Sequence, residues 1–345
     1  MPYGYIAQAL LSGEAVPFFG SAASAVCRPR DAMWRPGKPL SWKLREPFLP
    51  FGAELAKTLA KDSGYGAGEA ALVAALAELA DAAAKAAPGI PVEDIATALQ
   101  PVLEKHFGGP PELALVASFS SQVQGSRKIL EQTLRSAFYV TPELGALHTK
   151  LAALESIQLY VTTNYDDLLE RALQPRNPHV LVDQPDGRLI ISNDTGVEEV
   201  TRTDGALRER LTNLKTGNPT APILFKMHGS INRKEQQKDG YLITEGDYVD
   251  YLGRDGGAYI PIYIDSLMQG KNILFLGYSL EDWNVRVILS KLLKKIKPTD
   301  ARCWAIVLGR SQEEQEIWRT DHLNIYTTDL LEFSDNLAAE LDQRI

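Results

Sequence analysis

The sequence of 345 residues contains only two cysteines, Cys27 and Cys303. They lie far apart and neither belongs to a Cys-x-x-Cys pair, so they predict no disulfide framework and no cysteine-based metal site. Two isolated thiols are typical of a protein in a reducing compartment, and we therefore expect a cytoplasmic location. Each cysteine is expected to be a small buried side chain.

The start of the sequence lacks a basic segment followed by an apolar run, so we expect no signal peptide. The most apolar long stretch, residues 67–87, contains Glu69, Glu78, Asp81 and Lys85. Charges at this density predict an alanine-rich helix rather than a membrane span. We therefore expect no membrane partner.

Positive charge is in deficit, with 36 Lys and Arg against 44 Asp and Glu and a net charge of −8. This balance argues against broad, non-specific nucleic-acid binding, although it leaves room for a local basic patch. The shares of hydrophobic residues, 45%, and charged residues, 23%, are ordinary for a soluble globular protein. The length suffices for one large core or two domains.

Four apolar, β-rich runs each end in small or polar residues. The four endings are Gly20-Ser21-Ala22-Ala23-Ser24, Thr163-Asn164-Tyr165-Asp166, His228-Gly229-Ser230 and Gly277-Tyr278-Ser279. Because strands alternate with helical patterns, the sequence predicts an α/β protein with a mostly parallel, Rossmann-like sheet. The carboxyl ends of parallel strands share one edge of the sheet, and ligands bind there. We expect the four endings to meet at that edge.

The remaining pattern divides the chain into a core and an insertion. We assign residues 1–50 and 150–345 to the Rossmann-like core and residues 51–149 to an inserted all-helical module. Helices are expected within the module at residues 52–61, 69–86, 91–106 and 126–138. Alanine-rich helices pack closely, so the module is also a candidate oligomer interface.

Three other segments carry expectations. Residues 28–50, rich in Pro, Arg and Trp, predict a loop over the ligand, whose arginines either pair with phosphates or face solvent. The polar residues 192–220 predict a surface insertion, and residues 241–244 predict a strand.

Each motif also has a purely structural interpretation. Asn164 and Asp167 fit a helix-capping pattern, as do Ser279 and Asp282, and the residues after Gly20 fit a plain tight turn. The alternative for His228 is a buried histidine whose hydrogen bonds are satisfied. The occurrence of all four motifs in one chain favours a binding site over four unrelated turns.

These motifs, in this order, resemble the sirtuin family, whose pattern is Gly-Ala-Gly-x-Ser, Thr-Gln-Asn-x-Asp, His-Gly and Gly-x-Ser. The longer forms Asn-Tyr-Asp-Asp-Leu-Leu-Glu and Gly-Tyr-Ser-Leu-Glu-Asp resemble the bacterial sirtuin-like NAD hydrolases of anti-phage defence. The resemblance covers most of residues 5–30 and 155–335. The chain departs from the family at Ala22, which replaces a glycine, and lacks a Gly-x-Pro-Asp-Phe-Arg segment. It also has no cysteine between His228 and Gly277, so no four-cysteine zinc ribbon is expected there.

The resemblance implies that NAD is the substrate and that the nicotinamide–ribose bond is cleaved, giving nicotinamide and ADP-ribose. It implies two catalytic residues: Asn164, which would hold a ribose hydroxyl or the attacking water, and His228, which would act as a general base. An imidazole suits that role because it ordinarily titrates near neutral pH. The expected NAD-contacting residues are Gly20, Ser21, Ala22, Ser24, Thr163, Asp166, Gly277 and Ser279. No metal is expected.

Two other functions remain open: an NAD-dependent protein deacylase, and a non-catalytic module that senses NAD or ADP-ribose. The missing zinc ribbon argues against the deacylase, and Ala22 is the best support for the sensor. An NAD-depleting enzyme must be restrained. We therefore expect a homo-oligomer or a separate partner protein, which in related systems is a HerA-type ATPase or a short Argonaute.

Overall fold

The computed structural model describes residues 1–29, 32, 42–66, 112–254, 260–278, 303–307 and 323–344. Several expectations lie outside these ranges, namely the helices at residues 69–86 and 91–106, the arginines of residues 30–41, and Ser279 with the helix that follows it.

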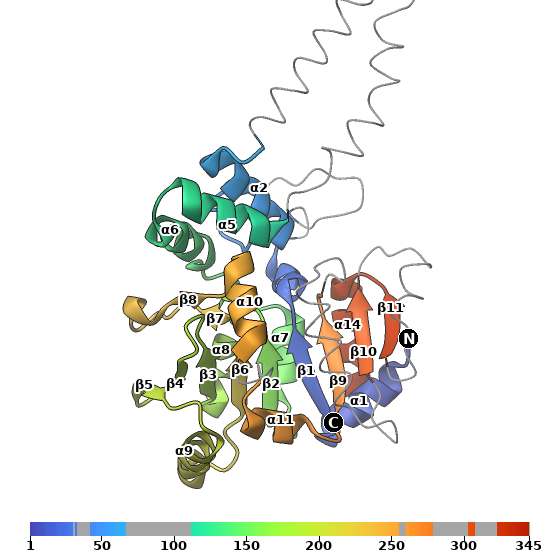
Figure 1. Ribbon diagram of the computed structural model, residues 1–345. Coiled ribbons are helices and arrows are strands. Elements are labelled where there is room, and N and C mark those ends of the chain that lie inside the picture. Colours follow the sequence, from blue (N-terminus) through green and yellow to red (C-terminus); the bar gives the residue numbers. More distant parts are fainter. Residues whose placement is uncertain are drawn as a thin grey trace, which may run out of the picture.

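The described chain is built around a nine-stranded sheet (Figure 1). Its strands are β1 (Ala15–Phe19), β2 (Leu159–Thr162), β3 (His179–Asp183), β4 (Leu189–Asn193), β5 (Gly196–Val200), β6 (Ile223–Lys226), β9 (Asn272–Leu276), β10 (Cys303–Val307) and β11 (Leu323–Thr327). They are ordered β11-β10-β9-β1-β2-β6-β3-β4-β5. Only the pairings β3–β4 and β4–β5 are antiparallel, which confirms the predicted mostly parallel, Rossmann-like sheet.

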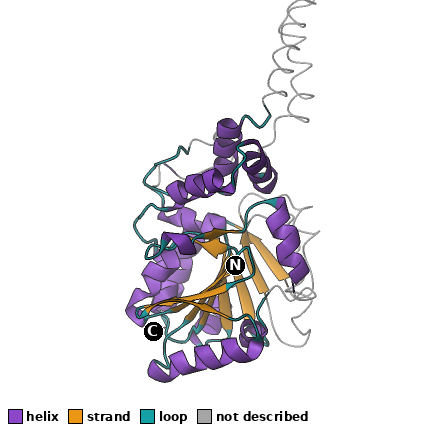
Figure 2. Ribbon diagram, turned by 60° about the vertical axis from the view of Figure 1, so that its left-hand side comes forward, coloured by secondary structure: helices purple, strands orange, loops and turns teal. Residues whose placement is uncertain are grey.

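Helices cover both faces of the sheet, and this explains the continuous apolar runs in its central strands (Figure 2). One face packs against α9 (Asp204–Gly217), α10 (Glu245–Gly253) and α11 (Ile262–Met268). The other packs against α1 (Tyr3–Leu11), α7 (Ala146–Ala153), α8 (Leu168–Leu173) and α14 (Leu330–Asp342). Phe18 and Phe19 of β1 enter opposite layers, as adjacent strand residues must.

The polar residues 192–220 are not a surface insertion, contrary to expectation. They form the edge strand β5 and the helix α9, whose Leu207 and Leu211 are fully buried in the core. The segment has a polar composition because only one narrow stripe of α9 faces the sheet, and the rest of the helix faces solvent.

Three helices form a separate hydrophobic cluster: α2 (Gly52–Ser63), α5 (Leu113–Val123) and α6 (Arg127–Phe138). They lie together above the sheet in Figure 1. Tyr165, Ile231 and Tyr241 belong to the same cluster, so the helices rest on the loops that follow β2 and β6. By contrast α7, at the end of the segment assigned to the module, packs with α8 and α14.

A short hairpin of β7 (Gly229–Ser230) and β8 (Gly240–Tyr241) follows His228. The strand expected at residues 241–244 therefore ends early. Thr244 instead caps the start of α10, where its side chain accepts a hydrogen bond from the Asp247 amide. Cys303 is buried as predicted, whereas Cys27 is only half-buried. None of the helices in the described ranges is long and apolar enough to cross a membrane.

Candidate functional site

The sheet has a topological switch point at β1, because later strands are added on both sides of this strand. The chain places β2 and β6 on one side of β1 and β9, β10 and β11 on the other. In an open parallel sheet, such a switch point separates the loops that follow two neighbouring strands, and ligands bind outside it. Here the neighbours are β1 and β9, with Phe19 opposite Leu276. The next residues along the chain are Gly20 and Gly277, which begin two of the four motifs.

Gly20 and Gly277 are required because the two loops touch through their backbones. Gly277 has a φ of +73°, and a Cβ added there would lie 2.2 Å from the Ala23 nitrogen. A Cβ at Gly20 would lie 2.8 Å from the Gly277 oxygen. The Ala22 amide donates a hydrogen bond of 2.9 Å to that same oxygen. In this structure the Ala22 amide therefore holds the β9 loop.

Asn164 is held in one orientation by two acceptors. Its Nδ2 donates to the Gly20 oxygen at 2.9 Å and to Ser24 Oγ at 3.0 Å. A backbone oxygen can only accept, so the amide must present its nitrogen to Gly20. Ser24, in the short helix η1 (Ser21–Cys27), donates its own hydrogen to Asp166 Oδ2 at 2.7 Å. Among the described residues, Asn164 Oδ1 accepts no hydrogen bond, so an acceptor is available at the switch point.

Asp166 holds the loop that carries Asn164 through hydrogen bonds of its carboxylate. It is buried, and its Oδ1 accepts a hydrogen bond of 3.1 Å from the Leu168 amide, at the first residue of α8. Helix α8 thus begins later than the capping interpretation placed it, and Asn164 does not cap it. Burial raises the pKa of Asp166, while the Lys226 charge and the Ser24 hydroxyl oppose that rise. This geometry fits a residue that orients the loop better than one that contacts NAD directly.

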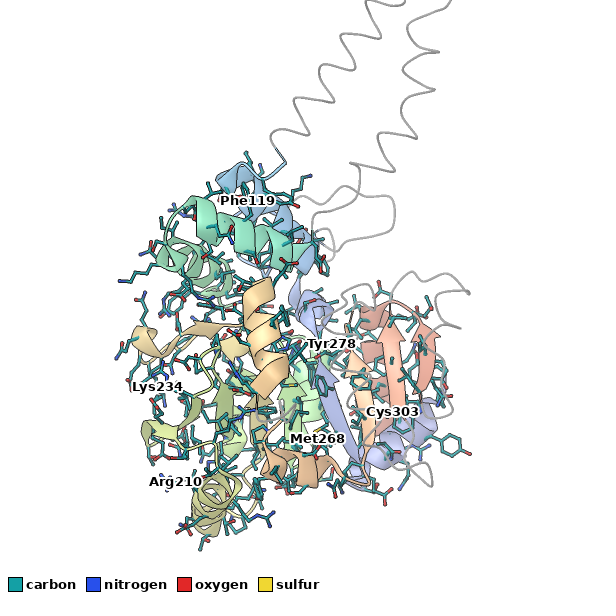
Figure 3. The ribbon with its side chains drawn as sticks, in the orientation of Figure 1. Phe119, Arg210, Lys234, Met268, Tyr278 and Cys303 are labelled. Carbon is teal, nitrogen blue, oxygen red and sulfur yellow. The ribbon has the colours of Figure 1, made fainter. Side chains whose placement is uncertain are left out.

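Thr163 reaches the β9 loop through a tyrosine. Thr163 Oγ1 lies 3.1 Å from the Tyr278 hydroxyl, and that hydroxyl donates to the Phe19 oxygen at 3.0 Å. Burial raises the pKa of Tyr278, so the phenol stays protonated. Sequence reasoning gave Tyr278 no role, although it stands inside the Gly-Tyr-Ser motif. The residue lies beside β9 and β1, where Figure 3 labels it.

His228 lies after β6, the neighbour of β2, and is only 3% exposed. Its ring meets Tyr248 and Tyr251 of α10 edge-on, with centroids 5.5 and 5.8 Å away. Its Nε2 is buried and has no hydrogen-bond partner among the residues that the structure describes. Burial lowers the pKa of His228 to about 3, so the imidazole is neutral at pH 7. The sequence predicted that His228 would titrate near neutral pH, and this prediction was wrong because the ring is buried.

The loops that carry Asn164 and His228 are joined through their backbones. The Ile231 amide, three residues after His228, donates to the Tyr165 oxygen at 3.0 Å. Within the hairpin itself, the Leu242 amide donates to the His228 oxygen at 2.9 Å. The glycine of the His-Gly motif serves the hairpin, because a Cβ at Gly229 would lie 2.1 Å from the Gly240 oxygen.

Two further expectations concern Ser21 and Ser24 as NAD-contacting residues, and the arginine at position 28. Ser21 is exposed at the start of η1, whereas the Ser24 hydroxyl is buried and already bonded within the loop. Arg28 does not face solvent, and protein groups already occupy its donors. Its guanidinium is buried against Glu54 and the Leu49 oxygen.

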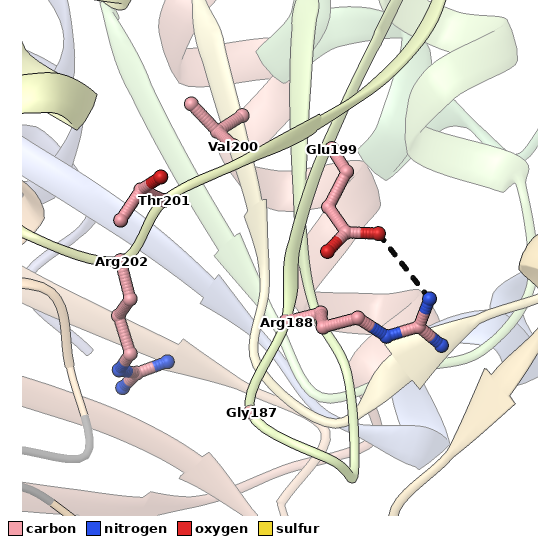
Figure 4. Close-up of a pocket in the computed structure, with 6 residues that line it drawn as sticks. All are labelled: Gly187, Arg188, Glu199, Val200, Thr201 and Arg202. Atoms are coloured by element: carbon pink, nitrogen blue, oxygen red, sulfur yellow. Dashed lines mark hydrogen bonds and ion pairs between the residues drawn. The ribbon is translucent and has the colours of Figure 1, made fainter.

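A separate depression of about 360 Å³ lies at the β4–β5 edge of the sheet (Figure 4). It is lined by Gly187, Arg188, Glu199, Val200, Thr201 and Arg202. None of the motif residues contributes to it. Its charges are matched internally, since Arg188 pairs with Glu199 and Arg202 with Asp183. Within the described ranges, no group of three or more His, Cys, Asp or Glu side chains is placed to hold a metal ion.

Comparisons with known proteins agree with the motifs. A family model described as SIR2-like domain matches residues 158–326. The NAD(+) hydrolase ThsA of Enterococcus faecium is 30% identical over 183 residues, which are 52% of this chain and 31% of that protein. ThsA of Bacillus cereus is 24% identical over 230 residues, covering 64% of this chain and 41% of that protein.

Defense-associated sirtuin 2 of Bacillus subtilis is 24% identical over 183 residues, covering 53% of this chain and 15% of that protein. The chain thus spans less than half the length of these curated relatives. The matched region contains the Asn164, His228 and Gly277 motifs, and it contributes to the sheet every described strand except β1. Over residues 158–326 the chain is therefore similar to the SIR2-like, or sirtuin-like, family.

Proposed function

We propose that the protein is an NAD hydrolase that cleaves the nicotinamide–ribose bond and releases nicotinamide and ADP-ribose. The observation that carries this proposal is the Asn164 amide, whose nitrogen is bound and whose oxygen is available beside the Gly20 loop. His228 Nε2 in the neighbouring loop is buried and has no partner within the described part of the chain, which supports the proposal. Relatives named as NAD(+) hydrolases add further support.

In the proposed reaction, the leaving group does not have to be protonated by a general acid. Nicotinamide leaves as a neutral molecule from a cationic ring, and the ribose passes through an oxocarbenium-like state. Asn164 Oδ1 accepts a hydrogen bond from a ribose hydroxyl or from the attacking water. The water oxygen bonds to the ribose carbon, and its proton passes to His228 Nε2 or to solvent. A histidine with a low pKa is a weak base. The water, however, becomes strongly acidic as it bonds to a cationic carbon, so a weak base can accept its proton.

The decisive experiment measures nicotinamide release from NAD by liquid chromatography, with and without an acetylated peptide. We expect release without peptide. Asn164→Ala and His228→Ala should each lose about 10²–10⁴-fold in rate, the range expected for a well-placed base or orienting group. Matched unfolding curves would show that the variants remain folded. Release that requires the peptide would instead identify a protein deacylase.

A binding module is the second candidate, and the low basicity of His228 favours it. Such a module would bind NAD or ADP-ribose without turnover. Titration calorimetry with NAD separates the two proposals. Tight binding without product, at every protein concentration tested, supports the module, whereas product that accumulates with time supports the hydrolase.

We also propose that the protein acts in anti-phage defence by depleting NAD, and that oligomerisation or a partner protein restrains it. The partners considered are a HerA-type ATPase and a short Argonaute. Size-exclusion chromatography coupled to the nicotinamide assay tests this restraint. A monomer that is fully active without any partner would contradict it.

A further inference from the structure

Lys226 is a charged side chain in the centre of the sheet. It is the last residue of β6 and is 0% exposed. Its Nζ donates to Glu170 Oε1 at 2.6 Å and also to the backbone oxygen of Asp166. A strand covered on both faces ordinarily carries apolar residues, as Leu224 and Phe225 of the same strand do. Lys226 breaks this pattern.

A buried ammonium group is costly unless its hydrogen bonds and its charge are satisfied. Glu170, on α8, satisfies the charge. The second contact has a different consequence because its acceptor belongs to the Asn164 loop. Lys226 stands two residues before His228, and Asp166 stands two residues after Asn164. One side chain therefore links the strand that leads to His228 with the loop that carries Asn164.

Asn164 depends on Asp166 through a short chain of contacts. The Asp166 carboxylate accepts from Ser24, and Ser24 accepts from the Asn164 amide. The Asp166 carbonyl is held by Lys226 on the opposite side of the same residue. Without that donor, the carbonyl would be left buried and unbonded, and its peptide could turn. The carboxylate would then move, and the Asn164 amide would move with it.

We propose that Lys226 is a positioning residue, which holds the Asn164 amide in register through the Asp166 carbonyl. This inference deepens the proposed NAD chemistry and rests on it. The contact with Glu170 supplies charge balance, whereas the contact with Asp166 supplies geometry. Because the two contacts involve different residues, they can be separated by substitution.

The test compares three variants: Lys226→Met, Glu170→Gln and the double variant. Lys226→Met leaves Glu170 without its partner, so both stability and activity should fall. Glu170→Gln leaves the ammonium without a counter-charge, so thermal stability should fall. The Asp166 contact survives in this variant, and kcat should stay close to the wild-type value. The double variant removes both charges, and thermal stability should recover.

The double variant is decisive. We expect kcat to fall about 100-fold, the size of loss that a displacement of about 1 Å produces at a reacting centre. KM for NAD should change much less, because the glycine loops that face the rest of the substrate are untouched. A double variant with both wild-type stability and wild-type kcat would show that Lys226 serves charge balance alone, and would overturn the proposal.

Affinity for ADP-ribose, measured by calorimetry, keeps this test separate from that of the hydrolase. If the wild-type protein binds ADP-ribose but releases no nicotinamide, the hydrolase proposal fails. The positioning role of Lys226 is then tested by the affinity for ADP-ribose. The double variant should then bind ADP-ribose at least tenfold more weakly than Glu170→Gln, since one displaced hydrogen bond to a polar ligand is worth about tenfold. Equal affinities, or a wild-type protein that binds neither NAD nor ADP-ribose, would overturn the inference.

Discussion

Asn164, Ser24 and Asp166 come from two loops, and each one fixes the next by a hydrogen bond. The carboxylate accepts, the hydroxyl both donates and accepts, and the amide is left with only its oxygen for a ligand. Lys226 extends the network on the far side of Asp166. At the residue scale, the candidate site is therefore a set of buried polar groups with few alternative arrangements.

The neutral state of His228 leads to a prediction about acid stability. An unfolded histidine takes up a proton below about pH 6.5, whereas burial lowers the pKa of His228 to about 3 in the folded chain. Between these values the unfolded state binds more protons, so stability falls as the pH falls. From pH 7 to pH 5, wild type should lose about 2 kcal/mol more unfolding free energy than His228→Gln.

Urea unfolding at the two pH values measures this difference. The comparison with a variant is needed because burial raises the pKa of Glu170 to about 7. Below about pH 7 that carboxyl group takes up a proton in the folded state, whereas the unfolded chain does so only near pH 4.5, so its contribution has the opposite sign. Equal losses for wild type and His228→Gln would show that His228 is not held neutral by burial.

At the scale of elements, the loops after β1 and β9 pack directly against each other. Gly277 lies against the backbone of Ala22 and Ala23, and Tyr278 reaches across to Thr163. The interlocked loops sit where the strand order reverses, so the topology of the sheet and the packing of the glycines define the same place.

Gly277→Ala tests this packing, and Gly270→Ala is its matched control. Both glycines have nearly the same backbone, with φ of +73° and +74°. At Gly270, however, no atom of the described ranges lies within 4 Å of the added Cβ. The control should lose only the conformational term, about 1–2 kcal/mol of unfolding free energy. Gly277→Ala should lose about 1–3 kcal/mol more through overpacking, and NAD affinity should fall with it. Equal losses in urea unfolding would contradict the close approach.

At the scale of the whole molecule, arginine–carboxylate pairs tie the α2, α5 and α6 cluster to the core. Arg127 binds Asp247 of α10, and Arg135 binds Asp239 near β8. Arg233 joins Asp167, directly after the Asn164 motif, to the Val140 oxygen just beyond α6. The helical cluster is therefore connected to the loop that carries the candidate site.

Arg28→Met measures how much a buried pair of this kind contributes. The Arg28 guanidinium is 2.5 Å from Glu54 on α2, and both side chains are almost fully buried. Removing one partner leaves the other charge buried, so the unfolding free energy should fall by about 3–5 kcal/mol. Lys150→Met is the control, since the Lys150–Asp342 pair is exposed and should contribute less than about 1 kcal/mol. A loss at Arg28 no larger than the control, in urea unfolding, would contradict the buried pair.

Much of the fold could be predicted from local patterns because buried parallel strands are continuous apolar runs, and β1, β2, β6 and β9 lie where those runs stand. The errors arose where the partner of a side chain decides its environment. Arg28 became a buried ion pair, and α9 became part of the core through only a few apolar residues. Neither outcome can be derived from composition, since the pairing residues are distant in the sequence.

The sequence by itself determined the class of fold, the four motif endings and the resemblance to sirtuins, because hydrophobic periodicity and short motifs are local properties. Only the tertiary structure decided how the motif side chains are used. In the folded chain Asp166 and Ser24 hold Asn164, and burial keeps His228 neutral. The Lys226 side chain contacts the loop that carries Asn164. The physical reason is that orientation, burial and charge depend on neighbours that the fold brings together from far along the chain.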